Sequence, residues 1–403
     1  MSVYRNIKRF HLYKMLSGAI IMGPIIMLYF LDVKGLDFKQ VMLLTSISAI
    51  ATVIFEVPTG SVADYWGRKA SLLLGSSFIA ISLAFYVFAQ GFWGCLIAEV
   101  LFALGFAFNS GADTALLYDS LLELKQQEEF QRVAGLAQSR LFWVQALGSV
   151  AAGFLYEYNV HLPMILSTIF VSLSAVVVML FKEPLVHQSA DSEQKSYLKQ
   201  VADSAKFTFT HKKVRALLVY VTVFFVFYRM GFFLFQPYMT TVNMPVRYIG
   251  VMFFLFNVTA ALTSRNCHKI MGFTKKRTLT FLSSLLIVSF LLLGISKIWI
   301  GSFAILLQQV ARGLYAPITR KYFNKHIASN IRATVLSFIS LVTRLAGSLT
   351  FPLLGILKDS TTIFNTHLVL AGVMMIFTVM SLIYIKDKLG KNTIDKAVEK
   401  QLT

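Results

Sequence analysis

Seven charged side chains lie inside long apolar stretches of this sequence. A charge at the centre of a bilayer costs roughly 2.5–3.5 kcal/mol on insertion scales, so each of them needs a chemical reason. A buried acid can bind a proton or a cationic substrate, and a buried arginine suits an anionic or polar substrate. The seven residues are Glu56, Glu99, Asp113, Arg140, Arg229, Arg312 and Arg344.

Two acidic residues in one apolar stretch predict a proton- or cation-binding stripe. Glu99 and Asp113 are separated by fourteen positions, which brings them within about 40° of one another on a continuous helix. Arg140 is expected at a depth similar to that of Asp113, and Arg344 at a depth similar to that of Glu56. Because their spans are also neighbours in the sequence, Asp113 and Arg140 are predicted to form a buried ion pair.

These five residues are candidates for proton coupling, although buried ion pairs often only compensate one another. If a substrate displaces or screens an arginine beside a carboxylate, the proton affinity of that carboxylate changes. Such a change is sufficient to exchange a proton for a substrate.

Arg229 follows the aromatic run Phe224-Phe-Val-Phe-Tyr228, and its apolar stretch contains no acid. A central cavity that receives an anionic or polar substrate would explain this charge. The aromatic side chains favour packing, and some of them are expected to line a pocket for an amphipathic solute. The candidates for substrate contacts are Arg229, Tyr228, Gln236, Asn257 and Arg312.

The composition excludes most soluble proteins. Of 403 residues, 56% are hydrophobic and 14% are charged, with a mean hydropathy of +0.67, whereas soluble domains have about 25% charged residues. A net charge of +19 is compatible with nucleic-acid binding or with basic cytoplasmic loops. The two cysteines form no cluster with metal-ligand spacing, and no metal site is predicted.

Apolar runs predict an all-α membrane protein with twelve transmembrane helices. With the N-terminus in the cytoplasm, the cytoplasmic segments contain 29 Lys and Arg residues and the outer loops contain five. This asymmetry predicts that both termini are cytoplasmic and argues against nucleic-acid binding. The predicted spans are 11–32, 39–61, 71–90, 92–118, 134–156, 161–181, 214–238, 246–264, 277–296, 298–319, 333–357 and 363–385.

The long polar connection between the sixth and seventh spans divides the chain into two halves. The predicted units are an N-terminal six-helix bundle (1–181), a cytoplasmic linker (182–213), a C-terminal six-helix bundle (214–386) and a tail (387–403). An amphipathic helix is expected at 197–210. Similar blocks recur about 200 positions apart, such as Gly153-Phe-Leu-Tyr-Glu157 and Gly355-Ile-Leu-Lys-Asp359, and they predict two pseudo-symmetric halves with a substrate site between them.

The segment Gly60-Ser-Val-Ala-Asp64-Tyr-Trp-Gly67-Arg68-Lys69 lies between the second and third spans. It resembles the G-x-x-x-D-x-x-G-R-[RK] signature of the major facilitator superfamily, and the twelve spans and half-repeat extend the resemblance over nearly the whole chain. From the residues alone, Gly60 permits close helix packing and Gly67 a tight turn.

The resemblance implies the fold of that family and alternating access. It also implies that the second and eleventh spans lie against each other, so Glu56 and Arg344 would form an ion pair across the two halves. The signature would then act as a cytoplasmic latch, with Asp64 near the start of the eleventh span and Arg68 paired with Asp119. The latch candidates are Gly60, Asp64, Gly67, Arg68, Lys69 and Asp119.

The chain departs from the family pattern at three places. Lys269 occupies the position of Asp64 in the second half, the fourth span lacks Arg-x-x-Gln-Gly, and no proline follows Gly148 and Gly153 in the fifth span. Drug/proton antiport is therefore not established by motifs.

The expected function is secondary transport of a small, hydrophobic or amphipathic compound, exported in exchange for protons. A proton-coupled uptake symporter or a uniporter is the alternative. An enzyme and a receptor are the alternatives from other protein classes. For an enzyme, the sequence contains no nucleotide-binding loop, no residues with metal-ligand spacing and no nucleophile motif. We expect a monomer in the plasma membrane that binds a small molecule, needs no cofactor and uses a proton gradient.

Overall fold

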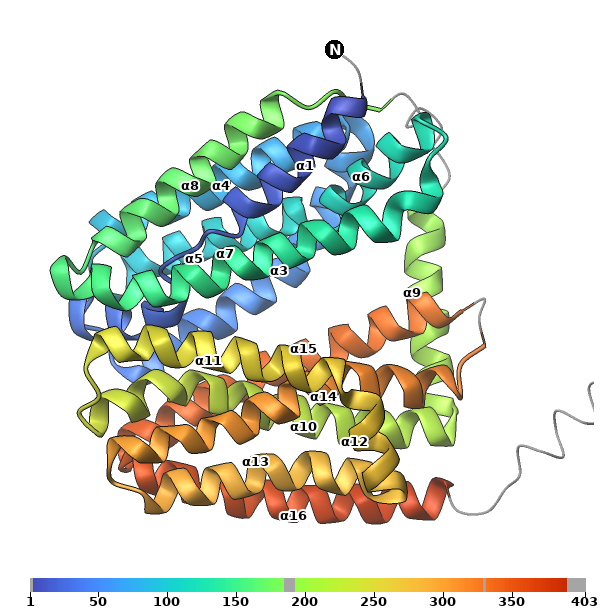
Figure 1. Cartoon of the computed structure of the whole chain (residues 1–403). Helices are drawn as coiled ribbons and strands as arrows, with labels where there is room; N and C mark the ends of the chain where they lie inside the picture. The colour runs from blue at the N-terminus through green and yellow to red at the C-terminus, as the bar shows by residue number, and fades with distance from the viewer. Residues whose placement is uncertain (1–2, 185–192, 329–330, 390–403) are drawn as a thin grey trace, which may run out of the picture.

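The computed structural model describes residues 3–184, 193–328 and 331–389, and in these ranges every regular element is a helix (Figure 1). Apolar side chains and fully satisfied backbone hydrogen bonds make helices the stable choice in lipid. The N-terminal group comprises α1 Tyr4–Ser17, α2 Ile26–Leu28, α3 Phe38–Trp66, α4 Arg68–Phe88, α5 Gly91–Asn109, α6 Ala112–Glu123, α7 Phe130–Tyr158 and α8 Leu162–Met179. The C-terminal group comprises α10 Lys212–Thr241, α11 Val246–Arg265, α12 Cys267–Thr274, α13 Thr278–Ile295, α14 Ile305–Asn324, α15 Arg332–Ser360 and α16 Ile363–Leu389.

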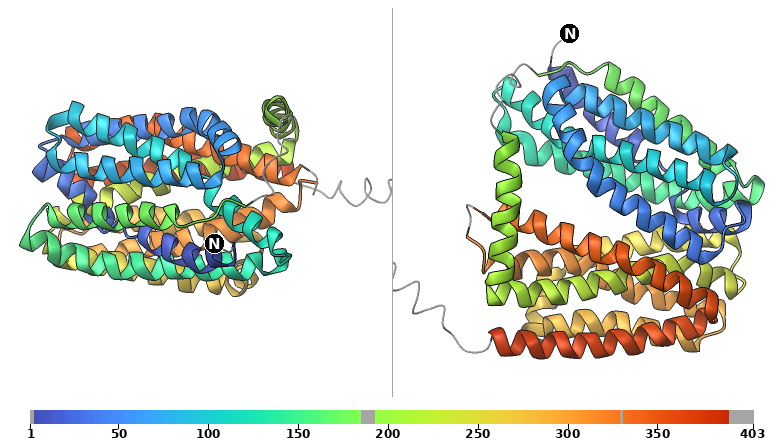
Figure 2. Two further views of the ribbon diagram at one scale, coloured as in Figure 1. Left: turned by 90° about the horizontal axis from the view of Figure 1, so that it is seen from above. Right: turned by 180° about the vertical axis from the view of Figure 1, so that it is seen from behind.

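The two groups lie one above the other in Figure 1, and α9 (Glu193–Thr210) runs between them along one edge. The helices α3 and α15 pack together, as do α7 and α11. Both contacts lie at the end remote from α9, and towards α9 the ribbons of the two groups diverge (Figures 1 and 2). The domain boundaries proposed from the sequence stay predictions.

Local sequence explains where α3 begins and ends. The Asp37 carboxylate accepts the Gln40 N–H at 2.6 Å, and the Gln40 side chain accepts the Asp37 N–H at 3.1 Å, which is a reciprocal N-terminal cap. At the other end, Gly67 has φ +93°, a conformation that other residues rarely adopt. The predicted tight turn at Gly67 is confirmed, and α4 begins at the next residue.

Two predicted spans are interrupted rather than continuous. In the first, α1 ends at Ser17, and the chain continues through a 3-10 turn (Gly23–Ile25), α2 and a π-helical turn (Tyr29–Val33). In the fourth, Ser110 and Gly111, with φ +78° at the glycine, separate α5 from α6. The prediction of one continuous helix over 92–118 is wrong, so the expected common face of Glu99 and Asp113 has no basis.

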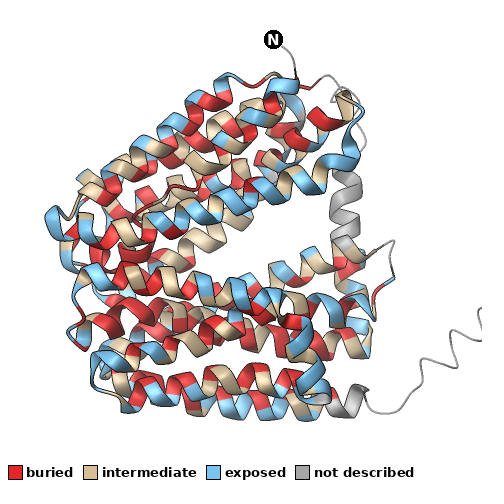
Figure 3. Cartoon of the chain, viewed as in Figure 1, coloured by how far each residue is buried: buried red, intermediate tan, exposed pale blue. Residues whose placement is uncertain are grey.

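Nine helices of the described ranges are long and apolar enough to cross a membrane. Large apolar side chains are exposed on the outward faces of α8 and α16, as a lipid-facing surface requires (Figure 3). Twelve spans and two cytoplasmic termini stay predictions. The expected amphipathic linker helix is present as α9, which packs against α10 and α15.

Candidate functional site

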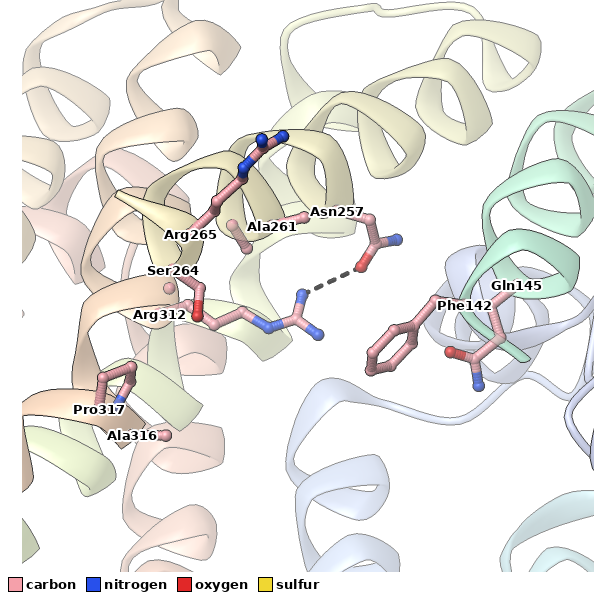
Figure 4. Close-up of a pocket in the computed structure, with 11 residues that line it drawn as sticks. Phe142, Gln145, Asn257, Ala261, Ser264, Arg265, Arg312, Ala316 and Pro317 are labelled. Atoms are coloured by element: carbon pink, nitrogen blue, oxygen red, sulfur yellow. Dashed lines mark hydrogen bonds between the residues drawn. The ribbon is translucent and has the colours of Figure 1, made fainter. Parts of the chain in front are cut away.

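A cavity of about 420 Å³ lies between the two groups of helices. Phe142 and Gln145 of α7 line it from one side, and residues of α11 and α14 line it from the other (Figure 4). Gln145 also lines a second cavity of about 370 Å³, and Ala316 also lines a third of about 460 Å³. Volumes of this size suit a small organic molecule.

Arg312 projects into this cavity from α14, and its guanidinium group donates to Asn257 Oδ1 at 3.3 Å (Figure 4). It also lies 3.4 Å from Gln309 Oε1. Gly313 allows α14 to approach α11, because a Cβ there would lie 2.4 Å from the Ala260 carbonyl oxygen. Of the substrate-contact candidates, Asn257 and Arg312 therefore line the space between the halves.

Arg229 lies half-buried on α10, with its guanidinium carbon 5.1 Å and 4.9 Å from the ring centres of Phe232 and Phe233. Arg312 and Arg344 are close enough to repel it electrostatically. Cation–π contacts of this kind hold a guanidinium group without neutralising it. Three arginines from three helices thus converge on one side of the molecule.

The N-terminal group contributes an ion pair between Lys14 of α1 and Asp113 of α6. Their side chains are 20% and 16% exposed and line the second cavity. The predicted Asp113–Arg140 pair is wrong: Arg140 is exposed and lies beside His11. Lys14 reaches Asp113 because α1 packs directly against α6, whereas similar depth in a membrane does not determine direction around a helix.

The predicted Glu56–Arg344 pair is confirmed, with Oε1 and Nη1 separated by 3.8 Å. It links α3 to α15, and the two side chains remain 35% and 55% exposed. Glu99 lies elsewhere, next to the hydroxyl groups of Tyr86 and Ser48. The acidic candidates therefore occupy three separate environments.

The loop between α3 and α4 holds the start of the interdomain linker. Glu183 accepts the backbone N–H groups of Arg68 at 2.7 Å and Lys69 at 2.8 Å. A carboxylate at a helix N-terminus is favoured by the helix dipole. A Cβ at Gly67 would lie 2.7 Å from the carboxyl carbon of Glu183, so glycine leaves room for this contact.

Other parts of the latch have different outcomes. At Gly60 no atom lies within 4 Å of an added Cβ, so the predicted close packing there is wrong in this conformation. The side chain of Asp64 lies outside the described residues. The expected pairing of Arg68 with Asp119 stays a prediction.

Each of the two repeated Gly-x-x-x-acid blocks contacts a helix of the opposite group, at the end remote from α9. A Cβ at Gly153 would lie 2.7 Å from the Val246 carbonyl oxygen, and Glu157 accepts the Arg247 N–H at 3.0 Å. The second block makes the equivalent contacts between α15 and α3: Gly355 lies against Lys39, and Asp359 accepts the Lys39 N–H at 2.8 Å. Each group of helices therefore caps a helix of the other.

Two further substrate-contact candidates lie in α10 away from the first cavity. Gln236 is buried and accepts the backbone N–H groups of Met27 and Leu28 at 3.0 and 3.3 Å. It thus satisfies donors that the interrupted first span leaves open. The Tyr228 ring stacks on the Phe224 ring, with 6.5 Å between the ring centres, and Tyr228 does not line the first cavity.

Sequence reasoning missed several residues of the site. Lys14 lies near a span end, where a lysine can extend its amine to water, so its position in the sequence does not indicate a buried ion pair. Glu183 carried one signal, its position directly after the sixth span. Phe142, Gln145 and Arg265 line the first cavity, but an uncharged side chain within a helix gives no sequence signal of facing a cavity.

Residues 14–296 match the sequence model of the Major Facilitator Superfamily. An uncharacterized MFS-type transporter, YxaM of Bacillus subtilis (strain 168), is 28% identical over 94% of this chain and 95% of its own length. A class H tetracycline resistance protein of Pasteurella multocida is 22% identical over 75% and 76% of the two chains. The crystal structure of the nucleoside transporter NupG superposes with a TM-score of 0.78 at 14% identity, covering 96% of this chain and all of NupG.

Proposed function

This chain belongs to the major facilitator superfamily, and we propose that it exports a small amphipathic compound in exchange for protons by alternating access. As a member it is a multi-pass secondary transporter and not a catalytic enzyme. The carrying observation is a cavity lined by both groups of helices, which contact each other at one end. This arrangement suits a site that opens alternately to either side.

The proposed topology has twelve spans, cytoplasmic termini and the boundaries given above, in a monomeric plasma-membrane protein. The end that carries α9 and the start of α1 then faces the cytoplasm, and the capped end faces outward. The present conformation is inward-facing on this assignment. Closure of the cytoplasmic end would engage the latch residues Gly60, Asp64, Gly67, Arg68, Lys69 and Asp119.

Proton coupling is assigned to Asp113 together with Lys14. Protonation of Asp113 would remove the negative charge that holds Lys14. Because both residues line a cavity that shares Gln145 with the central one, a bound compound and a proton would influence each other. Glu56 and Arg344, which bridge α3 and α15, are the second candidates, and Glu99 and Arg140 are weaker ones.

Uptake with protons, or uniport, is the alternative. The printed names of the comparison proteins fit both directions, since one is a resistance protein and another is a nucleoside transporter. Inside-out membrane vesicles separate these alternatives. With an acidic lumen, an exporter concentrates the compound inside and dissipates the proton gradient, whereas the symporter moves the compound and protons out together.

A crosslinking experiment with a transported compound tests alternating access. The Ser46 hydroxyl donates to the Ser348 carbonyl oxygen, across the contact between α3 and α15. In a variant with Cys95 and Cys267 replaced by serine, the pair S46C and S348C should be joined by a short thiol crosslinker. With one reporter cysteine added at the α9 end, we expect the joined protein to retain labelling of that cysteine and to lose transport until the reducible crosslink is cleaved. Transport by the fully crosslinked protein would contradict alternating access.

A further inference from the structure

Two arginines of the C-terminal group, Arg229 and Arg312, lie inside its apolar stretches. In the described residues, neither Arg229 nor Arg312 forms an ion pair with an acid. The polar partners of Arg312 are the neutral amides of Asn257 and Gln309. Arg229 is held by aromatic faces. Neutral amides and aromatic rings therefore hold these two guanidinium groups without neutralising their positive charge.

The sequence of the C-terminal group supplies no acid for this purpose. Between residues 214 and 386, Asp359 is the single acidic residue, against seventeen lysines and arginines. Its carboxylate caps α3 at the end remote from α9. No rearrangement confined to the C-terminal group can thus neutralise its arginines.

Arg344 is the one member of the cluster that has an acidic partner. The Glu56 oxygen lies 3.8 Å from its guanidinium nitrogen, beyond the usual range of a charge-assisted hydrogen bond. The Arg344 side chain is 55% exposed, so it remains accessible to another anion. A ligand that binds Arg344 would compete with a contact that joins the two groups of helices.

The opposite wall is apolar and neutral. Phe142 and Gln145 of α7 face Arg312 across the cavity (Figure 4). On the side of Arg312, the lining includes Ala260, Ala261 and Pro317 and a second cation, Arg265. Guanidinium groups bind carboxylate and phosphate groups in a bidentate manner. Taking the cavity of the proposed function as the binding site, we infer that the transported compound is an organic anion. Its carboxylate or phosphate head is held by Arg312, which lines the cavity, and attracted by the nearby charge of Arg229, and its apolar body lies against Phe142.

Matched probes test the sign of the charge. The purified full-length protein in detergent receives 4-phenylbutyrate, 4-phenylbutylphosphonate, 4-phenylbutylamine or 4-phenylbutanol, and binding is measured by thermal shift and calorimetry without any gradient. We expect an anionic probe to bind at least about tenfold more tightly than the amine and the alcohol, which corresponds to about 1.4 kcal/mol. Equal binding by the amine or the alcohol overturns the inference.

Variants locate the binding. R312Q and R229Q should each weaken anion binding about tenfold or more, and R312K and R229K should restore part of it because they retain the charge without the planar fork. K297Q is the matched control, since Lys297 is an exposed cation of the C-terminal group outside the cavity. Unchanged anion binding in correctly folded R312Q and R229Q overturns the inference.

Lipid is the other source of anionic groups. Repeating the measurement in phosphatidylcholine and in phosphatidylglycerol nanodiscs shows whether headgroups occupy the arginines. Stabilisation by phosphatidylglycerol, with no effect of the free anions in either lipid, overturns the inference. Because binding is measured without transport, its result is independent of the proposed function: anion binding without flux contradicts the transport proposal alone, and proton-coupled flux of a cation contradicts this inference alone.

Discussion

The two groups of helices differ in the charges they carry inside their apolar stretches. Residues 1–181 contain eleven acidic and eleven basic residues, whereas residues 214–386 contain one acid among seventeen cations. The acidic candidates Glu56, Glu99 and Asp113 lie in the first group, and the converging arginines lie in the second. The difference indicates a division of labour, in which one half carries a titratable carboxylate and the other holds an anionic ligand.

The Lys14–Asp113 pair is the sharpest test of the acidic half. Asparagine cannot bind and release a proton, so D113N is expected to abolish pH-driven flux and to leave Lys14 without its partner. Vesicle assays with a transported compound measure this loss.

D203N is the control for the acidic half, since Asp203 is exposed on α9. Unchanged pH-driven flux in D113N would remove Asp113 from the coupling role and weaken the division of labour.

The two groups of helices pack closely at the end remote from α9. A Cβ at Gly250 would lie 2.1 Å from the Ser149 carbonyl oxygen, across the contact between α11 and α7. Overpacking of this kind typically costs about 1–3 kcal/mol, so G250A should lower the thermal unfolding midpoint. It should also increase labelling of cysteines placed at this end.

G272A provides the comparison, because no atom lies within 4 Å of an added Cβ on that helical residue. We expect it to be neutral, or stabilising by up to about 1 kcal/mol, from helix propensity alone. Equal destabilisation by both variants would mean that the close approach at Gly250 is unimportant.

The two helix caps compare the halves directly. Glu157 of α7 caps α11, and Asp359 of α15 caps α3. Removing such a cap costs about 0.5–2 kcal/mol, so E157A and D359A should each destabilise by similar amounts. Both should also populate the conformation that is open at this end.

The pseudo-symmetry of the caps makes a further demand. The double variant should show additive effects, because the two caps lie on different helix pairs. Thermal unfolding and cysteine labelling check both points. If only one of the two variants had an effect, the sequence repeat would not correspond to equal contributions of the two caps to closing this end.

The sequence predicts the helical elements well, because long apolar runs bounded by charges leave few alternatives. It fails at Gly111 and after Ser17, where the helix breaks coincide with short turn-forming sequences, Asn109-Ser-Gly111 and Gly23-Pro24, that the length of the apolar run conceals. The Glu56–Arg344 pair could be predicted from depth and family architecture. The Lys14–Asp113 pair could not, since its formation depends on how α1 and α6 pack and turn.

The cavity lining marks the limit of sequence reasoning in the site. Asn257 and Arg312 stand out because polar groups are costly in an apolar stretch. Gln236 stands out for the same reason, yet it satisfies open backbone donors of the first span. A polar side chain in an apolar stretch can therefore contact a ligand or satisfy open backbone groups. The sequence does not distinguish these two roles, because they depend on how the helices pack.

The smallest expected effect concerns His326 and the lysines near it. His326 follows α14, and its ring lies 6.5 Å from that of His211. Burial, followed by the charges of Lys213, His211 and Lys325, lowers the pKa of His326 from 6.5 to about 4. Protonation is then easier in the unfolded chain, so this histidine stabilises the fold above pH 6.5 and the contribution is lost as the pH falls towards 4.

H326N removes that dependence and should flatten the fall of the unfolding midpoint between pH 6.5 and 4 by a few degrees. Unfolding curves of the two proteins across this range measure the difference. H268N, at an exposed position of α12, is the control and should follow the wild type. If the unfolding midpoints of H326N and the wild type fell in parallel with pH, the neighbouring cations would have no effect on the protonation of His326. The excess of positive charge in this half would then act only on the arginines near the cavity.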